Sequence, residues 1–362
     1  MRHILFFILV STTVAFSAAQ KFDLGSLPSV KLGKIVLAGK SAVTLASMGI
    51  PGARVEFVDP YPRANWGHPA YLRVISSEGK ILEEVRVNRP PTDLTRAKSL
   101  SEFTLPVVTP VKVTLKPNEK FRVKESKKHF ALLINGNASQ RHWNDYSFLF
   151  QTLQQIYGYD KENIFVADSF HKAERPDLDG DGAADILFES TVDGVRKLFG
   201  TLKEKLSADT DLLVVVNDHG EVKNGESILV LNDGEILASE FAKLLKGLPS
   251  KRTINVFQQC FGGGFVRPTV GEYRVSLAAS TNQEFSWATK DMQFDEFLYH
   301  WTAAIAGQRH DGSPLTSDLN RDGRISVSEA FSFAVAMDTT AENPVLESYP
   351  NSGFDKLLGL FL

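Results

Sequence analysis

Cysteine is almost absent from this sequence, since Cys260 is the only one among 362 residues. An internal disulfide is therefore excluded, because a bridge needs two thiols. The formal net charge of −3 lacks the strong basic excess of nucleic-acid-binding proteins, so we expect no nucleic-acid partner. The sequence also contains no zinc-ligand spacing, no phosphate-binding loop and no Gly-x-Ser-x-Gly turn. The usual signatures of zinc enzymes, nucleotide-binding proteins and serine hydrolases are thus missing.

Long apolar runs are missing too, apart from one at the N-terminus. A basic start is followed by an apolar run over residues 4–10, which weakens toward residue 16, and then by small residues at 17–19. This order predicts a signal peptide over residues 1–19, removed before Gln20. The run is shorter than the roughly 20 apolar residues that cross a bilayer. We therefore expect a secreted or periplasmic protein with no stable membrane insertion after signal cleavage.

Residues 20–125 read as β structure. Short β-branched or alternating runs at 34–37, 53–58 and 71–75 are separated by glycine- and proline-rich turns. Such a pattern is typical of a small all-β sandwich domain, and the segment 49–58 resembles the first hairpin of immunoglobulin-like modules. We expect this domain to pack against or space its neighbour, because nothing in its sequence indicates a ligand.

Residues 126–362 have a different pattern, in which apolar runs alternate with helical stretches. The predicted strands cover 129–135, 164–167, 212–216, 253–257 and 273–279, and the predicted helices cover 143–157, 192–206, 238–248, 294–306 and 328–336. Alternation of this kind predicts an α/β domain with a mostly parallel sheet and helices on both faces.

Two of these strands are followed by reactive side chains. His219 follows the strand 212–216, and Cys260 follows the strand 253–257. The carboxyl ends of neighbouring parallel strands meet at one edge of a sheet, which is where open α/β sheets place their active sites. An imidazole there can take the proton of a thiol and return it to a leaving amine. The N–H groups of Gly220 and Cys260 would supply an oxyanion hole.

Simpler interpretations exist for each residue alone. A single cysteine is usually a buried, inert side chain, and a single histidine is more often structural than catalytic. Their joint position after two strands favours a catalytic pair.

The chain from about 129 to 300 resembles the legumain-like branch of the caspase-haemoglobinase group of cysteine peptidases (clan CD). The matching motifs are Asp218-His219-Gly220, Gln258-Gln259-Cys260 and the Arg-His-x-x-Asp pattern of residues 141–145, with a similar C-terminal segment at 342–346. The resemblance implies a caspase-like sheet, Cys260 as the nucleophile, His219 as the general base and acid, and a peptide or protein as the substrate.

The same resemblance implies a specificity pocket formed by Arg141, Gln258 and Asp295. Legumains have a glutamate where Gln258 stands, whereas caspases have a glutamine. Arg141 with Gln258 would suit an aspartate side chain, and Asp295 would favour an asparagine, so both stay open. Glycines at 262–264 replace larger residues of the family, which leads us to expect an open wall of the cleft.

The expected function is therefore an exported cysteine endopeptidase that cleaves peptide bonds, with asparagine or aspartate before the cut. An amine acceptor in place of water would make the same residues a transpeptidase. The alternative from another class is a catalytically silent calcium-binding scaffold or adhesion protein.

Calcium is the one cofactor that the sequence indicates. Residues 318–329 fit the twelve-residue EF-hand loop, in which we expect oxygen ligands from Asp318, Asn320, Asp322, Arg324 (through its carbonyl), Ser326 and Glu329. A second acidic loop begins in the same way but lacks a glutamate at its twelfth position, and its weaker candidate ligands are Asp177, Asp179, Asp181 and Asp185. Either loop could instead be a solvated acidic turn.

Overall fold

The computed structural model describes residues 20–23, 35–36, 42–43, 54–64, 70–87, 98–99, 106–136, 139–169 and 176–349. The predicted signal peptide lies outside these ranges. The chain divides into a smaller unit, residues 1–62 and 69–104, and a larger unit, residues 63–68 and 105–362. Within the described ranges, no helix has both the length and the apolar character needed to cross a membrane.

The smaller unit contains an antiparallel sheet with the strand order β6-β5-β4-β1-β7. Its strands are β1 (Gln20–Asp23), β4 (Arg54–Asp59), β5 (Ala70–Ile75), β6 (Ile81–Val87) and β7 (Lys98–Ser99), and a separate pair consists of β2 (Ile35–Val36) and β3 (Ala42–Val43). In β5, Ala70, Leu72 and Val74 are buried while the residues between them are partly exposed, as expected for a sheet with one covered face. The immunoglobulin-like sandwich stays a prediction.

The larger unit is built on a seven-stranded sheet with the order β10-β9-β8-β11-β15-β16-β17. Its strands are β8 (His129–Asn135), β9 (Ile164–Asp168), β10 (Phe188–Glu189), β11 (Asp211–Val216), β15 (Arg252–Phe257), β16 (Arg274–Ala278) and β17 (Val345–Ser348). All neighbouring pairs are parallel except β16 and β17. The predicted α/β domain with a mostly parallel sheet is therefore confirmed.

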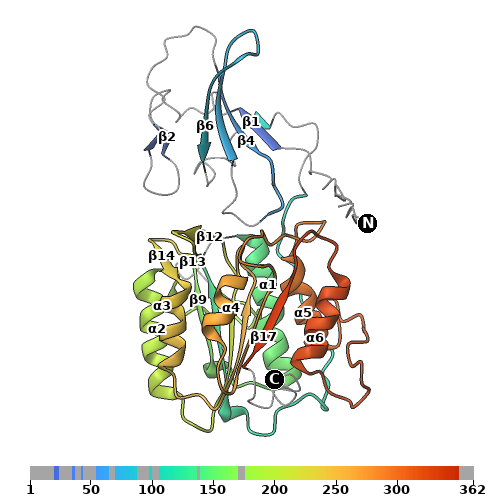
Figure 1. The fold of residues 1–362 in the computed structure, drawn as a ribbon. Coiled ribbons are helices and arrows are strands. Elements are labelled where there is room, and N and C mark those ends of the chain that lie inside the picture. Colours follow the sequence, from blue (N-terminus) through green and yellow to red (C-terminus); the bar gives the residue numbers. More distant parts are fainter. Residues whose placement is uncertain are drawn as a thin grey trace, which may run out of the picture. The chain divides into compact units, whose positions relative to one another are not determined.

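Helices cover both faces of this sheet (Figure 1). They are α1 (Gln140–Gln151), which continues as the π-helical η3 (Thr152–Tyr157), α2 (Val192–Lys205), α3 (Ala238–Lys246), α4 (Gly263–Thr269), α5 (Glu296–Ala306) and α6 (Val327–Met337). Thr191 caps α2 by accepting a hydrogen bond from the Gly194 N–H, as its position before the helix predicts. A small antiparallel sheet, β12 (Gly220–Lys223), β13 (Glu226–Val230) and β14 (Glu235–Leu237), follows β11.

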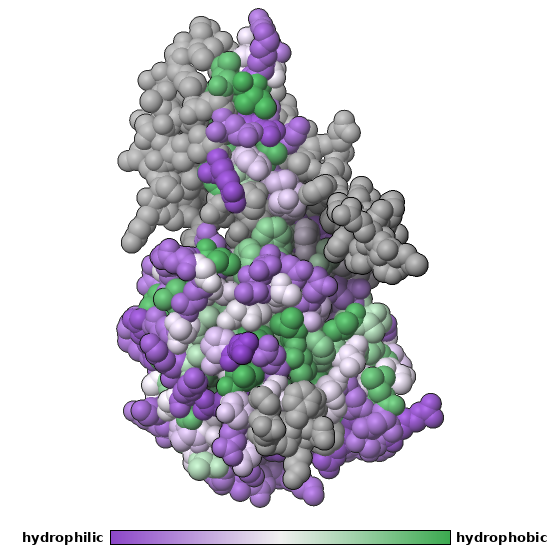
Figure 2. Space-filling model, viewed as in Figure 1, coloured by the Kyte–Doolittle hydropathy of each residue, from purple (hydrophilic) through white to green (hydrophobic). Residues whose placement is uncertain are grey.

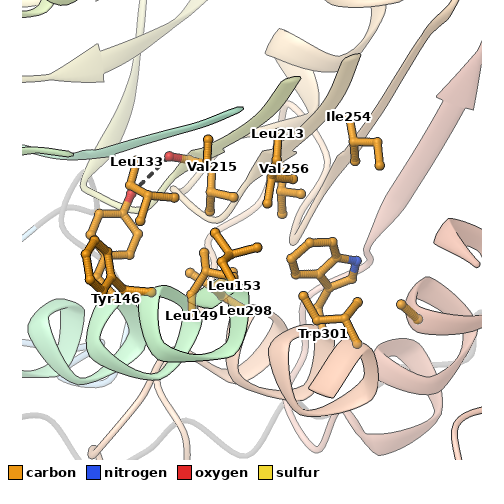
Figure 3. Packing of buried hydrophobic residues seen from close by; sticks show 14 of the residues in the cluster. Leu133, Tyr146, Leu149, Leu153, Leu213, Val215, Ile254, Val256, Leu298 and Trp301 are labelled. Atoms are coloured by element: carbon orange, nitrogen blue, oxygen red, sulfur yellow. Dashed lines mark hydrogen bonds between the residues drawn. The ribbon is translucent and has the colours of Figure 1, made fainter. Parts of the chain in front are cut away.

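The central strands are apolar on both sides because each side faces its own layer of helices. Leu213 and Val215 of β11 pack with α1 and α5 (Figure 3), where the Tyr146 hydroxyl donates to the Val215 carbonyl at 3.0 Å. Val214 and Val216 point to the other side, toward α2, α3 and α4. Complete burial of one such side chain contributes about 1.5–3 kcal/mol. The two cores hold the carboxyl ends of the strands in fixed positions.

The outer surface of the larger unit is mixed. In the view of Figure 2, its described residues are mostly hydrophilic, with hydrophobic areas toward the middle.

Residues before the first predicted strand of this domain also belong to the larger unit. The Val111 N–H donates to the Asn144 side chain at 3.1 Å, and the Thr114 N–H donates to the His310 carbonyl at 2.7 Å. The larger unit therefore includes residues 105–125, which the sequence pattern assigns to the smaller domain.

Candidate functional site

The register of the sheet places His219 and Cys260 at matching positions. Val216, the last residue of β11, lies opposite Phe257, the last residue of β15, in a parallel ladder. His219 and Cys260 each come three residues after those paired positions. The two reactive side chains therefore leave neighbouring strands at the same edge of the sheet.

Gly220 brings the two strand ends into direct contact. A Cβ atom added to Gly220 would lie 1.9 Å from the Cys260 carbonyl oxygen and 3.0 Å from Cγ of Gln259. No side chain fits in that space, so only glycine allows the approach. The segment that carries His219 is thus fixed against the segment that carries Cys260.

The N–H of Gly220 is turned away from its hairpin partner. The Val230 N–H donates to the His219 carbonyl at 3.2 Å, and Gly220 lies opposite Leu229 in the same antiparallel pair. Hydrogen-bonded and non-hydrogen-bonded pairs alternate in antiparallel sheets. Gly220 and Leu229 therefore form a non-hydrogen-bonded pair, and the Gly220 N–H points away from β13. An N–H with this orientation is suited to an oxyanion hole.

Cys260 is fully buried within a tight turn. Burial raises the pKa of its thiol to about 12, although the Ser286 N–H, 3.3 Å from Sγ, acts in the opposite direction. The next residue, Phe261, has a φ of +59°, an unfavourable conformation for a residue with a side chain. Strain of this kind persists only where the surroundings hold it, and it often marks functional sites.

A second histidine lies beside His219. The ring centroids of His142 and His219 are 5.5 Å apart. His142 is buried, with Nδ1 3.0 Å from the Asn135 side-chain oxygen and Nε2 3.4 Å from an Asp295 carboxylate oxygen. Burial, followed by the charge of Arg141, lowers the pKa of His142 well below its usual value. His142 therefore stays neutral, and it packs against the ring of His219 without placing a positive charge beside it.

The three residues expected to form a specificity pocket converge at the start of α5. Asp295 is the N-cap of this helix, and its carboxylate lies 2.8 Å from Nε of Arg141. Gln258 accepts a hydrogen bond from the Leu298 N–H, in the first turn of α5, at 2.7 Å. The structure therefore brings together the carboxylate of Asp295 at the start of α5, the guanidinium of Arg141 in α1, and the amide of Gln258 after β15.

The buried side chain of Asp145 holds the start of α5 in place. Asp145 accepts hydrogen bonds from the Asp295 N–H and from Nδ2 of Asn217, both at 3.0 Å. Burial, followed by the charge of Asp295, raises the pKa of Asp145 well above its usual value. The Arg-His-x-x-Asp run thus supplies one residue that pairs with Asp295, one that adjoins His219, and one that holds the start of α5.

The segment of residues 284–288 adjoins the sulfur of Cys260, a contact that only the folded chain shows. Besides Ser286, it includes Trp287, whose N–H donates to the carboxylate of Glu342 at 2.9 Å. Asn343 donates to Glu284 at 2.6 Å, so the C-terminal segment fixes this stretch of chain. In the sequence, residues 342–346 only resemble the C-terminal segment of the family. Their contact with Trp287 carries no local signal, because it joins distant parts of the chain.

The glycines after Cys260 do not leave an open wall, contrary to expectation. A Cβ on Gly263 would lie 2.8 Å from the Ser280 carbonyl oxygen, and one on Gly264 would lie 2.1 Å from Oγ of Ser227. These residues begin α4, and their lack of a side chain allows the helix to pack closely on its neighbours. The backbone at Ser280 and the side chain of Ser227 fill the expected gap.

The loop 318–329 has a folded turn in which its oxygens accept backbone hydrogen bonds. Asp318 accepts from the N–H groups of Asp322 (3.1 Å) and Gly323 (2.8 Å). Glu329 accepts from Leu319 and Asn320, both at 3.0 Å, and forms a capping box with Ser326 at the start of α6. The six expected ligands include oxygens that suit calcium. In this conformation, however, the carboxylate of Glu329 caps a helix.

In the second acidic loop, residues 177–185, the carboxylates surround the ammonium group of Lys161. Asp177, Asp179 and Asp185 have carboxylate oxygens that lie within 4.8 Å of one another. Nζ of Lys161 lies 3.2 Å from Asp179 and 2.6 Å from each of Asp181 and Asp185. The ammonium group compensates the acidic loop, so these carboxylates can lie close together without a metal ion.

No family model matches the sequence, and no curated protein matches it. The crystal structure of protein GSU0716 from Geobacter sulfurreducens is similar, with 11% identity and a TM-score of 0.41, over 64% of this chain and 97% of that one.

Proposed function

We propose that this chain is an exported cysteine endopeptidase with a caspase-like fold, in which Cys260 is the nucleophile and His219 is the general base and acid. The observation that supports this proposal most directly is the contact of Gly220 with the Cys260 carbonyl. It joins the histidine-bearing turn to the cysteine-bearing turn at the edge where β11 and β15 end together.

The chemistry follows from the state of the thiol. A pKa of about 12 means that the thiol keeps its proton at neutral pH, so the base must remove it as the sulfur attacks the substrate carbonyl. The Cys260 sulfur then bonds to the carbonyl carbon, and the oxygen receives the negative charge. That charge is stabilised by the N–H groups of Gly220 and Cys260.

Collapse of this intermediate completes the cycle. The carbon–nitrogen bond breaks, the amine leaves with the proton held by His219, and a thioester remains on Cys260. Water, deprotonated by His219, then attacks the thioester and releases the acid product and the thiol. An amine in place of water would give a new peptide bond.

Asparagine is the residue that the pocket best suits before the cleaved bond. The charge of Arg141 is compensated by Asp295 at 2.8 Å, so the pair carries no excess positive charge for an aspartate. An asparagine amide offers both a donor and an acceptor, which match a carboxylate and a guanidinium.

The single cysteine makes a direct test possible. A peptidyl acyloxymethyl ketone that ends in asparagine should label the protein at one site, and Cys260→Ala should abolish the label. His219→Ala should reduce labelling and peptide hydrolysis by about 10²–10⁴-fold, the usual effect of a general base.

His129→Ala is the matched control, because His129 is the first residue of β8 and lies at the amino-terminal ends of the strands, opposite to the proposed site. It should leave both rates within about twofold of those of the unmodified protein. Equal labelling of the His219→Ala and unmodified proteins would contradict the proposed pair, and a silent calcium-binding scaffold would then be the better account.

A further inference from the structure

A short segment of the chain itself pairs with the backbone beside Cys260. Ala64 forms an antiparallel bridge with Trp287, and the Ala288 N–H donates to the Arg63 carbonyl at 2.9 Å. Nη2 of Arg63 donates to the Ala288 carbonyl at 2.8 Å. Both partners in this contact belong to the larger unit.

The pairing runs toward the sulfur. Trp287 directly follows Ser286, whose N–H lies 3.3 Å from Sγ of Cys260. Because the pairing is antiparallel, the step from Arg63 to Ala64 proceeds from Ala288 toward Ser286, and hence toward the thiol. An extended peptide that presents a carbonyl to Cys260 would use the same direction and the same backbone groups, as in recognition by strand addition.

We propose that Arg63 and Ala64 occupy the backbone of residues 286–288, the edge where a peptide substrate would pair, and that they compete with the substrate for this edge. This inference rests on the proposed peptidase function. The N–H and carbonyl of Ala288 are both engaged by Arg63, so a substrate can pair there only after the segment leaves. A tethered competitor acts at an effective concentration that reaches the millimolar range.

The occupant also indicates the substrate class. Ala64 is only 4% exposed, so the position opposite Trp287 has little room for a side chain larger than alanine. The edge therefore suits extended peptides with a small residue at this position. In the sequence, Asn65 comes next; it lies outside the described residues, and its side chain is the type that the proposed pocket suits.

Two variants test the competition. Arg63→Ala removes the side-chain bond to Ala288, and Ala64→Arg introduces a side chain that does not fit against Trp287. Exposed residues of the larger unit supply the matched controls, Arg267→Ala and Ala184→Arg. The full chain is labelled at Cys260 with acetyl-Arg-Ala-Asn acyloxymethyl ketone, which must pair with the edge, and with iodoacetamide, which need not. Thermal melting of each variant shows whether it is folded.

The two reagents should respond differently. We expect the peptide reagent to label Arg63→Ala about tenfold faster than the unmodified protein, the effect of removing one charge-assisted hydrogen bond. Ala64→Arg should be labelled faster by a similar factor of about ten, because its side chain does not fit against Trp287. The iodoacetamide rate and both controls should stay within about twofold. Peptide-reagent rates within twofold for both segment variants would overturn the inference and leave the peptidase function intact. A peptide reagent that labels none of the proteins would overturn the function, and the inference with it.

Discussion

Gly220 lies against the carbonyl group of Cys260, at a distance that leaves no room for even one added carbon atom. This contact aligns the turn after β11 with the turn after β15, and the register of β12 and β13 directs the Gly220 N–H away from its hairpin. The proposed catalytic site therefore depends on a glycine as much as on the two reactive side chains.

Gly220→Ala should abolish most activity. The added methyl would force the Cys260 carbonyl and the Gly220 N–H apart, and loss of one oxyanion donor costs about 10²–10³ in rate. The measurement is kcat/KM on a peptide substrate, together with the melting temperature. The matched control is Gly200→Ala in α2, where an added Cβ meets nothing within 4 Å. It should keep full activity and gain about 1 kcal/mol of stability, because alanine favours a helix over glycine. Full activity in the Gly220→Ala protein would argue against this oxyanion hole.

The pH dependence of alkylation reports the state of the thiol. Burial disfavours the charged thiolate and raises the pKa of Cys260 to about 12, so the reactive fraction is small at neutral pH and increases with pH. The rate of iodoacetamide labelling should therefore rise about tenfold for each pH unit from 7 to 10. The urea-unfolded protein should reach a plateau above its ordinary thiol pKa of about 8.5. A plateau below pH 7 in the folded protein would indicate a preformed thiolate and contradict the proposed order of proton transfer.

Asparagine should be preferred to aspartate as the residue before the cut bond. Acetyl-Arg-Ala-Asn-aminomethylcoumarin should be hydrolysed at least about tenfold faster than the aspartate analogue, because an aspartate would face the Asp295 carboxylate. Asp295→Asn removes that charge and leaves Arg141 uncompensated, so it should shift the preference toward aspartate. Faster cleavage of the aspartate substrate by the unmodified protein would assign the pocket to acidic residues.

Calcium binding can be assigned to one of the two acidic loops by thermal shift. We expect calcium to raise the melting temperature of the unmodified protein, by an amount that corresponds to about 2.7 kcal/mol at a hundredfold excess over Kd. The paired change Asp318→Asn and Asp322→Asn should remove this shift. A paired change in the other loop, Asp179→Asn and Asp181→Asn, should preserve it, because Lys161 already compensates those carboxylates. A shift lost only with the second pair would transfer the site to that loop.

Local patterns predicted most of the larger unit. The strand expected at 129–135 has those bounds, and the strands expected at 212–216 and 253–257 differ by one residue at their start. Runs of apolar residues identify strands that are covered on both faces, since each residue of the run must be buried. The glycine-rich α4 was not predicted, because glycine has a low helix propensity and its close packing is a tertiary effect.

The acidic loops show the limit of motif matching. The spacing of Asp177, Asp179 and Asp181 is the same whether a metal or an amine lies among them. Lys161 comes from η4 (Lys161–Asn163), before β9, and only the folded chain places its ammonium group there. Similarly, the glutamate that ends the loop 318–329 serves as a helix cap in this structure, a role that its position before α6 also allows.

By itself, the sequence determined that the larger unit is an α/β domain and that His219 and Cys260 both follow buried strands, because hydrophobic periodicity and strand ends are local properties. Only the tertiary structure decided that β11 and β15 are neighbours in register, that residues 286–288 adjoin the sulfur, and that Arg63 and Ala64 pair with that edge. These contacts join residues far apart along the chain. They arise from the packing of whole elements, which no local pattern of side chains encodes.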